Sequence, residues 1–134
     1  MPSAFTIAPR GPFSLAEAAR FLDAFAPVDQ RADPDAPELV LPRSVVALRA
    51  DGDGVHGEVV AGEEADDLPA RVARVLSLDH DATGWVELGR RDPVLGARQA
   101  ARPGLRPVLF PSAWEAAAWA LLTQRTQRRQ ALAL

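Results

Sequence analysis

The side chains of this 134-residue chain that are best suited to binding an anion lie close to its C-terminus. They are Gln124, Arg125, Arg128 and Arg129. A guanidinium group is always charged and can donate paired hydrogen bonds to phosphate oxygens, so this cluster could contact the backbone of a nucleic acid. A solvated helix face has the same composition, and the residues alone leave both interpretations open.

The charge of the chain is divided unevenly along its length. Residues 1–67 contain 5 Arg against 13 Asp and Glu, a net charge of -8, whereas residues 68–134 contain 10 Arg against 5 acids, a net charge of +5. The overall net charge of -3 therefore conceals a basic C-terminal half. That half is where an anionic partner would be expected to bind.

The other polar motifs predict no metal or catalytic site. His80 lies between Asp79 and Asp81, but a third ligand at suitable spacing is missing, which indicates a solvated turn. Residues 51–54 begin like a calcium-binding loop, yet Gly62 stands where that loop needs Glu, which favours a hairpin turn. The sequence has no cysteine, no glycine-rich phosphate loop and no nucleophile-elbow motif. We therefore expect neither a metal nor a cofactor.

The chain also lacks features of export or membrane insertion. Its first residues contain neither a basic segment nor an apolar one, so no secretory signal is expected. No apolar run approaches the roughly 20 residues that a membrane-spanning helix needs. Because the absence of cysteine fits a reducing compartment, we expect a cytoplasmic protein with no membrane partner.

Two helices are expected in residues 1–78. Ser14, followed by Glu17 three residues later, forms a capping-box pattern in front of an apolar stripe that continues to Phe25. A second helix is expected over residues 68–78. Its inward face would contain Leu68, Val72, Val75 and Leu76.

The strands of the same region are short and rich in branched residues. One is expected over residues 5–10, and after a polar loop at 27–37 others are expected at 39–41 and 44–50, separated by Pro42. The Asp-Gly-Asp-Gly turn at 51–54 then predicts a hairpin with a strand at 55–61. Together these elements predict an α+β fold with a small antiparallel sheet and two helices.

Residues 79–134 have a helical pattern. Short helices are expected at 85–89 and 92–101, the second with Asp92 as N-cap and Pro93 in the first turn. After a proline-rich segment at 103–111, Ser112 and Glu115 form another capping box, and the helix that follows is expected to continue to Leu134.

The final helix is expected to bury Trp114, Ala118, Leu121 and Leu122. Trp85, Trp114 and Trp119 could together form an aromatic pocket that stacks an electron-poor alkylated purine. Trp114 and Trp119 cannot share one helix face, so we assign Trp114 to the core and Trp119 to the pocket.

Five strings in the chain resemble the front half of the AlkA-type 3-methyladenine DNA glycosylases, also called glycosylase II. They are residues 12–14, 75–79, 92–95, 102–106 and 114–124. The resemblance covers essentially the whole chain and is specific from Leu76 onward. It implies a TATA-binding-protein-like α+β domain at residues 1–78, followed at 79–134 by the beginning of an all-helical glycosylase domain that is incomplete.

The resemblance also implies where double-stranded DNA is contacted. In the family, residues near the middle of the helix after the proline-glycine turn wedge into the minor groove while the damaged nucleotide is flipped out. Residues 121–124 fit the family pattern, whereas Arg125 stands where an apolar residue or Gln is usual, and its planar guanidinium could fill the gap left by the base. The implied DNA contacts are Gln124, Arg125, Arg128 and Arg129, with Trp119 in the base pocket.

The implied function is base excision repair of alkylated purines, by hydrolysis of the N-glycosidic bond of a flipped base. The family's helix-hairpin-helix turn, Leu-Pro-Gly-x-Gly, does not occur in these 134 residues, and neither does the catalytic Asp that follows that turn. The chain alone is therefore expected to lack catalytic residues, to bind DNA weakly or not at all, and to self-associate through an exposed C-terminal helix.

Two alternatives to a glycosylase part remain at the level of the sequence. One is a stand-alone, non-catalytic α+β module that binds DNA or a protein partner. The other is a small-ligand or regulatory domain with no role on DNA.

Overall fold

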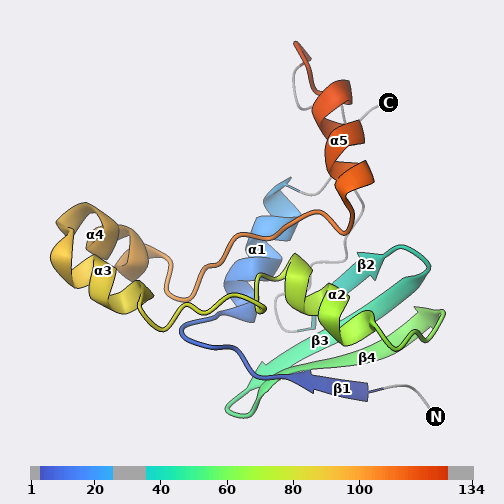
Figure 1. The fold of residues 1–134 in the computed structure, drawn as a ribbon, viewed down its shortest axis with the longest axis horizontal. Helices are drawn as coiled ribbons and strands as arrows, with labels where there is room; N and C mark the ends of the chain where they lie inside the picture. The colour runs from blue at the N-terminus through green and yellow to red at the C-terminus, as the bar shows by residue number, and fades with distance from the viewer. Residues whose placement is uncertain (1–3, 26–35, 127–134) are drawn as a thin grey trace.

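The computed structural model describes residues 4–25 and 36–126, which form a four-stranded antiparallel sheet and five helices, as the predicted α+β class requires. The strands are β1 (Ala4–Ile7), β2 (Glu38–Leu41), β3 (Ser44–Asp51) and β4 (Gly54–Gly62), in the spatial order β1-β4-β3-β2. The helices are α1 (Leu15–Phe25), α2 (Leu68–Val75), α3 (Trp85–Arg91), α4 (Pro93–Ala101) and α5 (Ala113–Leu122) (Figure 1). Among the described residues, no helix has the length and apolar character needed to span a bilayer.

The hydrophobic core lies between one face of the sheet and the helices α1 and α2. Its buried side chains are Leu15, Ala18, Leu39, Leu41, Val46, Leu48, Val55, Leu68, Val72, Val75, Leu76 and Leu78. The four inward residues predicted for the second helix are all buried, which confirms its apolar face. The helix itself ends at Val75 rather than residue 78, because Ser77 adopts a left-handed backbone with φ of 54°.

The predicted hairpin between β3 and β4 is confirmed. Asp51 pairs with Gly54 across its turn, and the Asp53 N–H donates to Asp51 Oδ1 at 2.9 Å. Pro42 and Arg43 separate β2 from β3, with Arg43 in the left-handed region. β1 ends at Ile7 and so is shorter than the strand predicted at 5–10, and the loop predicted at 27–37 falls mostly outside the described residues.

The capping boxes predicted at α1 and α5 are half confirmed. Ser14 Oγ accepts the Glu17 N–H at 3.3 Å, and Ser112 Oγ accepts the Glu115 N–H at 3.1 Å. At α1 the reciprocal half is absent, because the Ser14 N–H donates to the carbonyl of Gly104 at 2.9 Å. The Glu17 carboxylate is thereby left to interact with arginines instead.

The two short helices of the C-terminal half are confirmed as a hairpin. Asp92 caps α4 by accepting the N–H groups of Val94 and Leu95 at 2.8 and 3.2 Å. Gln99 Nε2 of α4 donates to the Trp85 carbonyl of α3 at 2.6 Å. The hairpin stands to one side of the sheet (Figure 1), and neither helix contains a buried residue.

The prediction for the final helix is wrong in two respects. α5 ends at Leu122 instead of continuing through the described residues, because Thr123 Oγ1 donates to the Trp119 carbonyl at 2.7 Å and Arg125 adopts a φ of 56°. Residues 127–134 lie outside the described part of the chain. Of the four side chains expected to be buried, Ala118 is half-buried and the other three are exposed, with 80% of Trp114, 69% of Leu121 and 50% of Leu122 accessible to solvent.

Candidate functional site

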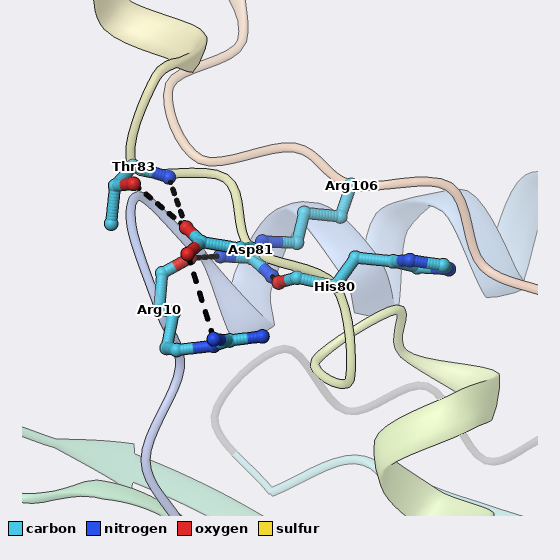
Figure 2. Close-up of polar contacts among 5 residues, drawn as sticks. All are labelled: Arg10, His80, Asp81, Thr83 and Arg106. Atoms are coloured by element: carbon cyan, nitrogen blue, oxygen red, sulfur yellow. Dashed lines mark hydrogen bonds and ion pairs between the residues drawn. The ribbon is translucent and has the colours of Figure 1, made fainter.

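Arg106, in the segment between α4 and α5, holds together three parts of the chain that are distant in sequence. Only 5% of its surface is exposed. Its guanidinium donates to five backbone carbonyls (Figure 2 shows it beside His80 and Asp81). The acceptors and distances are Pro12 at 2.9 Å, Ser77 at 2.9 Å, His80 at 3.1 Å, Arg10 at 2.6 Å and Gly11 at 3.2 Å.

Burial lowers the pKa of Arg106, and the negative charge of Asp81 partly offsets that effect. An arginine keeps its proton in proteins, so the guanidinium is a cation solvated by carbonyl dipoles instead of water. Because its donors are already used, Arg106 has little capacity to bind a phosphate or a carboxylate. It acts as a structural tie between residues 10–12, residues 77–80 and its own segment.

Two glycines allow the same three segments to approach closely. Gly11 has a φ of 86°, and a Cβ atom there would lie 2.4 Å from the carbonyl carbon of Ala82. Gly104 has a φ of 74°, and its Cβ would lie 2.7 Å from the carbonyl carbon of Phe13. Any other residue at these positions would combine a disfavoured backbone conformation with a clash.

Glu17 of α1 is a buried carboxylate that lies close to Arg102, in the same segment as Arg106. It is 6% exposed and pairs with Arg20 on its own helix. Its Oε2 atom lies 3.6 Å from Arg102 Nη1 and accepts no hydrogen bond from a described residue. The string at 102–106 that carried part of the family resemblance therefore contacts α1 through Arg102, the residue in front of α1 through Gly104, and residues 10–12 and 77–80 through Arg106.

A cavity of about 640 Å³ lies beside Arg106. Its apolar lining includes Trp85 and Leu88 of α3 together with Leu105, Pro107 and Leu109. The cavity thus separates the α3–α4 hairpin from the segment that leads to α5. Of the three tryptophans, Trp85 lines this cavity.

Asp81 lies on the polar side of this cavity. Its Oδ1 accepts the N–H and the hydroxyl of Thr83 at 2.9 and 2.7 Å, and its Oδ2 lies 3.5 Å from Arg10 Nη1 (Figure 2). The Thr83 N–H, followed by the Thr83 hydroxyl and the charge of Arg10, lowers the pKa of Asp81. The carboxylate is thus an ionised group occupied by local partners.

The predicted DNA contacts are placed by the structure only in part. Gln124 and Arg125 are exposed in the turn that follows α5, and Arg128 and Arg129 lie outside the described residues. Trp119 is half-buried on the opposite side of α5 from Trp114, and its carbonyl accepts the Thr123 N–H at 2.9 Å. The structure therefore presents two of the four polar residues together at the helix end.

A second polar cluster, which sequence analysis missed, lies on the face of the sheet opposite the core. The ring of His56 lies between Thr6 and Asp51, with Nδ1 2.9 Å from Thr6 Oγ1 and Nε2 2.8 Å from Asp51 Oδ1. The hydrogen bonds from His56 and from the Asp53 N–H lower the pKa of Asp51. The cluster links β1 to the β3–β4 turn. Only the pairing of β1 with β4, which no local pattern specifies, brings Thr6 to His56.

Within residues 4–25 and 36–126, no three His, Asp or Glu side chains gather closely enough to hold a metal ion. His80 is exposed, and its Nε2 lies 3.8 Å from Asp79 Oδ1. In comparisons with known proteins, no protein-family model and no curated protein matches the chain.

Proposed function

We propose that this chain supplies the α+β part and the first helices of a DNA glycosylase that removes alkylated purines. In the intact enzyme the reaction would be hydrolysis of the N-glycosidic bond of a base flipped out of the duplex. The helix-hairpin-helix and the catalytic Asp would be supplied outside these 134 residues, which contain no Leu-Pro-Gly-x-Gly turn. The chain's own contribution would be to position DNA through Gln124 and Arg125.

The observation that supports this proposal most directly is the conformation of Arg125. It follows α5 in an exposed position with a φ of 56°, where glycine or asparagine is the usual residue. A non-glycine residue in the left-handed region costs on the order of 1 kcal/mol. An arginine kept there at that cost projects a planar cation from the helix end, which suits contact with a phosphate or the gap left by a flipped base.

The charge distribution and the exposed helices also support the proposal. The half of the chain that contains Arg125 has a net charge of +5, which favours approach to DNA. The helices α3, α4 and α5 bury no residue, as expected for helices whose packing partners belong to a larger helical domain.

Fluorescence anisotropy with a short duplex that contains an abasic-site analogue tests the proposal. We expect weak binding at low ionic strength, with a Kd of about 10⁻⁴ to 10⁻⁶ M that weakens steeply with added salt. Arg125→Ala should weaken binding about fivefold to tenfold. It should also reduce the slope of log affinity against log salt concentration by about one, the value of a single phosphate contact. Arg125→Lys, which keeps the charge but loses the planar fork, should recover only part of the affinity.

The control is Arg98→Ala, which removes an exposed arginine of α4 and should leave the affinity nearly unchanged. Equal affinities for the wild type and Arg125→Ala would contradict a DNA contact at this position. If the chain alone bound DNA tightly, and the dependence of its affinity on salt concentration indicated several phosphate contacts, a stand-alone DNA-binding module would be favoured instead.

A further inference from the structure

We propose that Thr6, His56 and Asp51 form a hydrolytic site for small carboxylic esters on the outer face of the sheet. Thr6 of β1 would be the nucleophile and His56 of β4 the general base. Asp51, at the end of β3, would be the positioning residue that holds the imidazole. This activity is separate from the proposed role on DNA, and its test contains no DNA.

The hydrogen bonds of the His56 ring decide which of its nitrogens can act as a base. Nε2 lies 2.8 Å from Asp51 Oδ1, and because an ionised carboxylate can only accept, Nε2 must carry the proton. The hydrogen bonds from His56 and from the Asp53 N–H lower the pKa of Asp51, which keeps its carboxylate ionised at neutral pH. In the neutral ring Nδ1 then has a free lone pair, and it accepts the Thr6 hydroxyl at 2.9 Å. His56 is therefore placed to remove the Thr6 proton.

Strand pairing fixes the row of side chains to which this site belongs. Thr6 is directly opposite His56 in the β1–β4 ladder, and Arg49 is directly opposite His56 in the β3–β4 ladder. Directly opposite side chains point to the same face of a sheet, with Cβ atoms about 5 Å apart. The geometry is thus held by backbone hydrogen bonds, which position a site more precisely than loops do.

A cavity of about 310 Å³ is lined by Thr6 and His56 but not by Asp51. This is the arrangement that a nucleophile requires, because the base reaches the substrate while the positioning carboxylate lies behind the ring. The cavity volume is at the lower end of the range for small-molecule sites. Its lining includes three small apolar side chains, those of Ala4, Ala36 and Ala47. They would accept a short acyl group, which is why the proposed substrates are esters of small carboxylic acids.

Arg49 supplies a positive charge at the same cavity. Its side chain is exposed and forms part of the cavity lining. Attack on an ester places negative charge on the carbonyl oxygen, and a guanidinium within reach of that oxygen stabilises the charge. Glu58, which also lines the cavity, would repel a negatively charged acyl group. We therefore expect a neutral acyl group to be preferred.

The reaction would be an acyl transfer in two halves. Thr6 Oγ1 attacks the ester carbonyl carbon while its proton moves to His56 Nδ1, and the tetrahedral adduct then breaks its bond to the alcohol oxygen. The departing alcohol takes the proton from Nδ1, and the acyl group stays on Thr6 as an ester. Water, deprotonated by Nδ1, cleaves that ester, which releases the carboxylic acid and restores the threonine hydroxyl.

Hydrolysis of p-nitrophenyl acetate by the complete 134-residue chain tests this proposal. Thr6→Val and His56→Gln should each lower kcat/KM at least about tenfold, whereas Thr6→Ser, which keeps a hydroxyl, should retain activity. The matched control is His80→Gln, which removes the only other histidine of the chain and should leave the rate unchanged. Circular dichroism of each variant verifies that the fold is retained.

Two further measurements test the assigned roles. Asp51→Asn should lower kcat about tenfold with little change in KM, because an amide can donate to Nε2 and so remove the lone pair from Nδ1. Mass spectrometry after an acid quench should find an acetyl group on the peptide that contains Thr6. The chain has no lysine or cysteine to compete for that group.

A wild type that is no faster than Thr6→Val, or an acetyl group that is never found on Thr6, would overturn the proposal. An unchanged kcat in Asp51→Asn would overturn the positioning role of Asp51.

Discussion

Arg106 is the residue on which the described structure depends most clearly. Its five hydrogen bonds would be lost in Arg106→Ala, and even Arg106→Lys retains at most three donors in a different geometry. We expect both variants to lower the free energy of unfolding by about 2–4 kcal/mol, because buried carbonyls are left without partners. Urea unfolding monitored by circular dichroism measures the change.

The matched control for Arg106 is Arg98→Lys, an exposed position on α4, where less than about 0.5 kcal/mol is expected. If Arg106→Lys were as stable as the wild type, the five-carbonyl arrangement would not be the source of the stabilisation. When the fraction of folded protein is taken into account, Arg106→Lys should bind DNA as tightly as the wild type does, because the guanidinium donors of Arg106 are already occupied by backbone carbonyls.

Gly104 gives a second prediction at the scale of single residues. Gly104→Ala would place a Cβ against the Phe13 backbone in a left-handed conformation, so we expect a loss of about 1–3 kcal/mol in the free energy of unfolding. Gly84→Ala is the control, since a Cβ there meets nothing within 4 Å. Thermal unfolding of the two variants should therefore differ clearly, and equal melting temperatures would contradict the close approach.

Acid stability should report on Asp81. Its pKa is lowered in the folded state, so its contribution is present above the unfolded-state value of about 3.9 and is lost as the pH falls through the folded value. Asp81→Asn should make the unfolding free energy fall less steeply below about pH 4. The effect is small because the carboxylate is exposed. If the unfolding free energy of Asp81→Asn fell with pH as steeply as that of the wild type, the lowered pKa of Asp81 would not contribute to acid sensitivity, contrary to this prediction.

Single residues were the hardest feature to predict from the sequence. Arg106 stood out only through the family resemblance, because its acceptors are backbone carbonyls 26 to 96 residues away. The cluster of Thr6, His56 and Asp51 depends in the same way on strand pairing. Trp114 was assigned to the core because it and Trp119 cannot share one helix face, yet Trp114 is 80% exposed in the described chain.

At the scale of elements, local sequence patterns correctly predicted the turns, helix faces and helix starts that depend on interactions between nearby residues. The Asp-Gly-Asp-Gly turn, the inward face of α2 and the Asp92–Pro93 start of α4 all follow from interactions within a few positions. The end of α5 did not follow, because the sequence after Leu122 keeps a helical pattern while Thr123 and Arg125 end the helix. The division into domains at residue 78 stays a prediction.

The two serine caps allow a test of how differently α1 and α5 are supported. Ser14→Ala removes a cap from a helix packed in the core and should lower the global free energy of unfolding by about 1 kcal/mol. Ser112→Ala removes the equivalent cap from α5, which buries no residue. Its effect should therefore be faster amide exchange within α5, with little change in global stability.

Hydrogen exchange read by NMR or mass spectrometry, combined with urea unfolding, distinguishes these effects. We expect weak amide protection in α5, which contains no buried residue, and strong protection in α2, which packs in the core. Global destabilisation of equal size by the two serine variants would show that α5 is packed into the cooperative core, contrary to the structure.

At the scale of the whole molecule, the described residues form a well-packed α+β unit and three helices that expose much of their apolar surface. The hydrophobic pattern predicted the α+β unit because its core is built from its own residues. The helices could be predicted as elements but not in their packing, because packing depends on surfaces that the described residues do not provide. The segment from Arg102 to Arg106 joins the two parts through contacts with α1 and residues 77–80.

The proposed function makes this chain the front part of an alkylpurine DNA glycosylase. Reading the coding sequence beyond the codon for Leu134 tests it most directly. We expect the translated sequence to contain a Leu-Pro-Gly-x-Gly turn followed by an Asp, which together would supply the phosphate-binding hairpin and the catalytic carboxylate. A stop codon with no such turn in any reading frame downstream would contradict the claim and leave the chain as a stand-alone module.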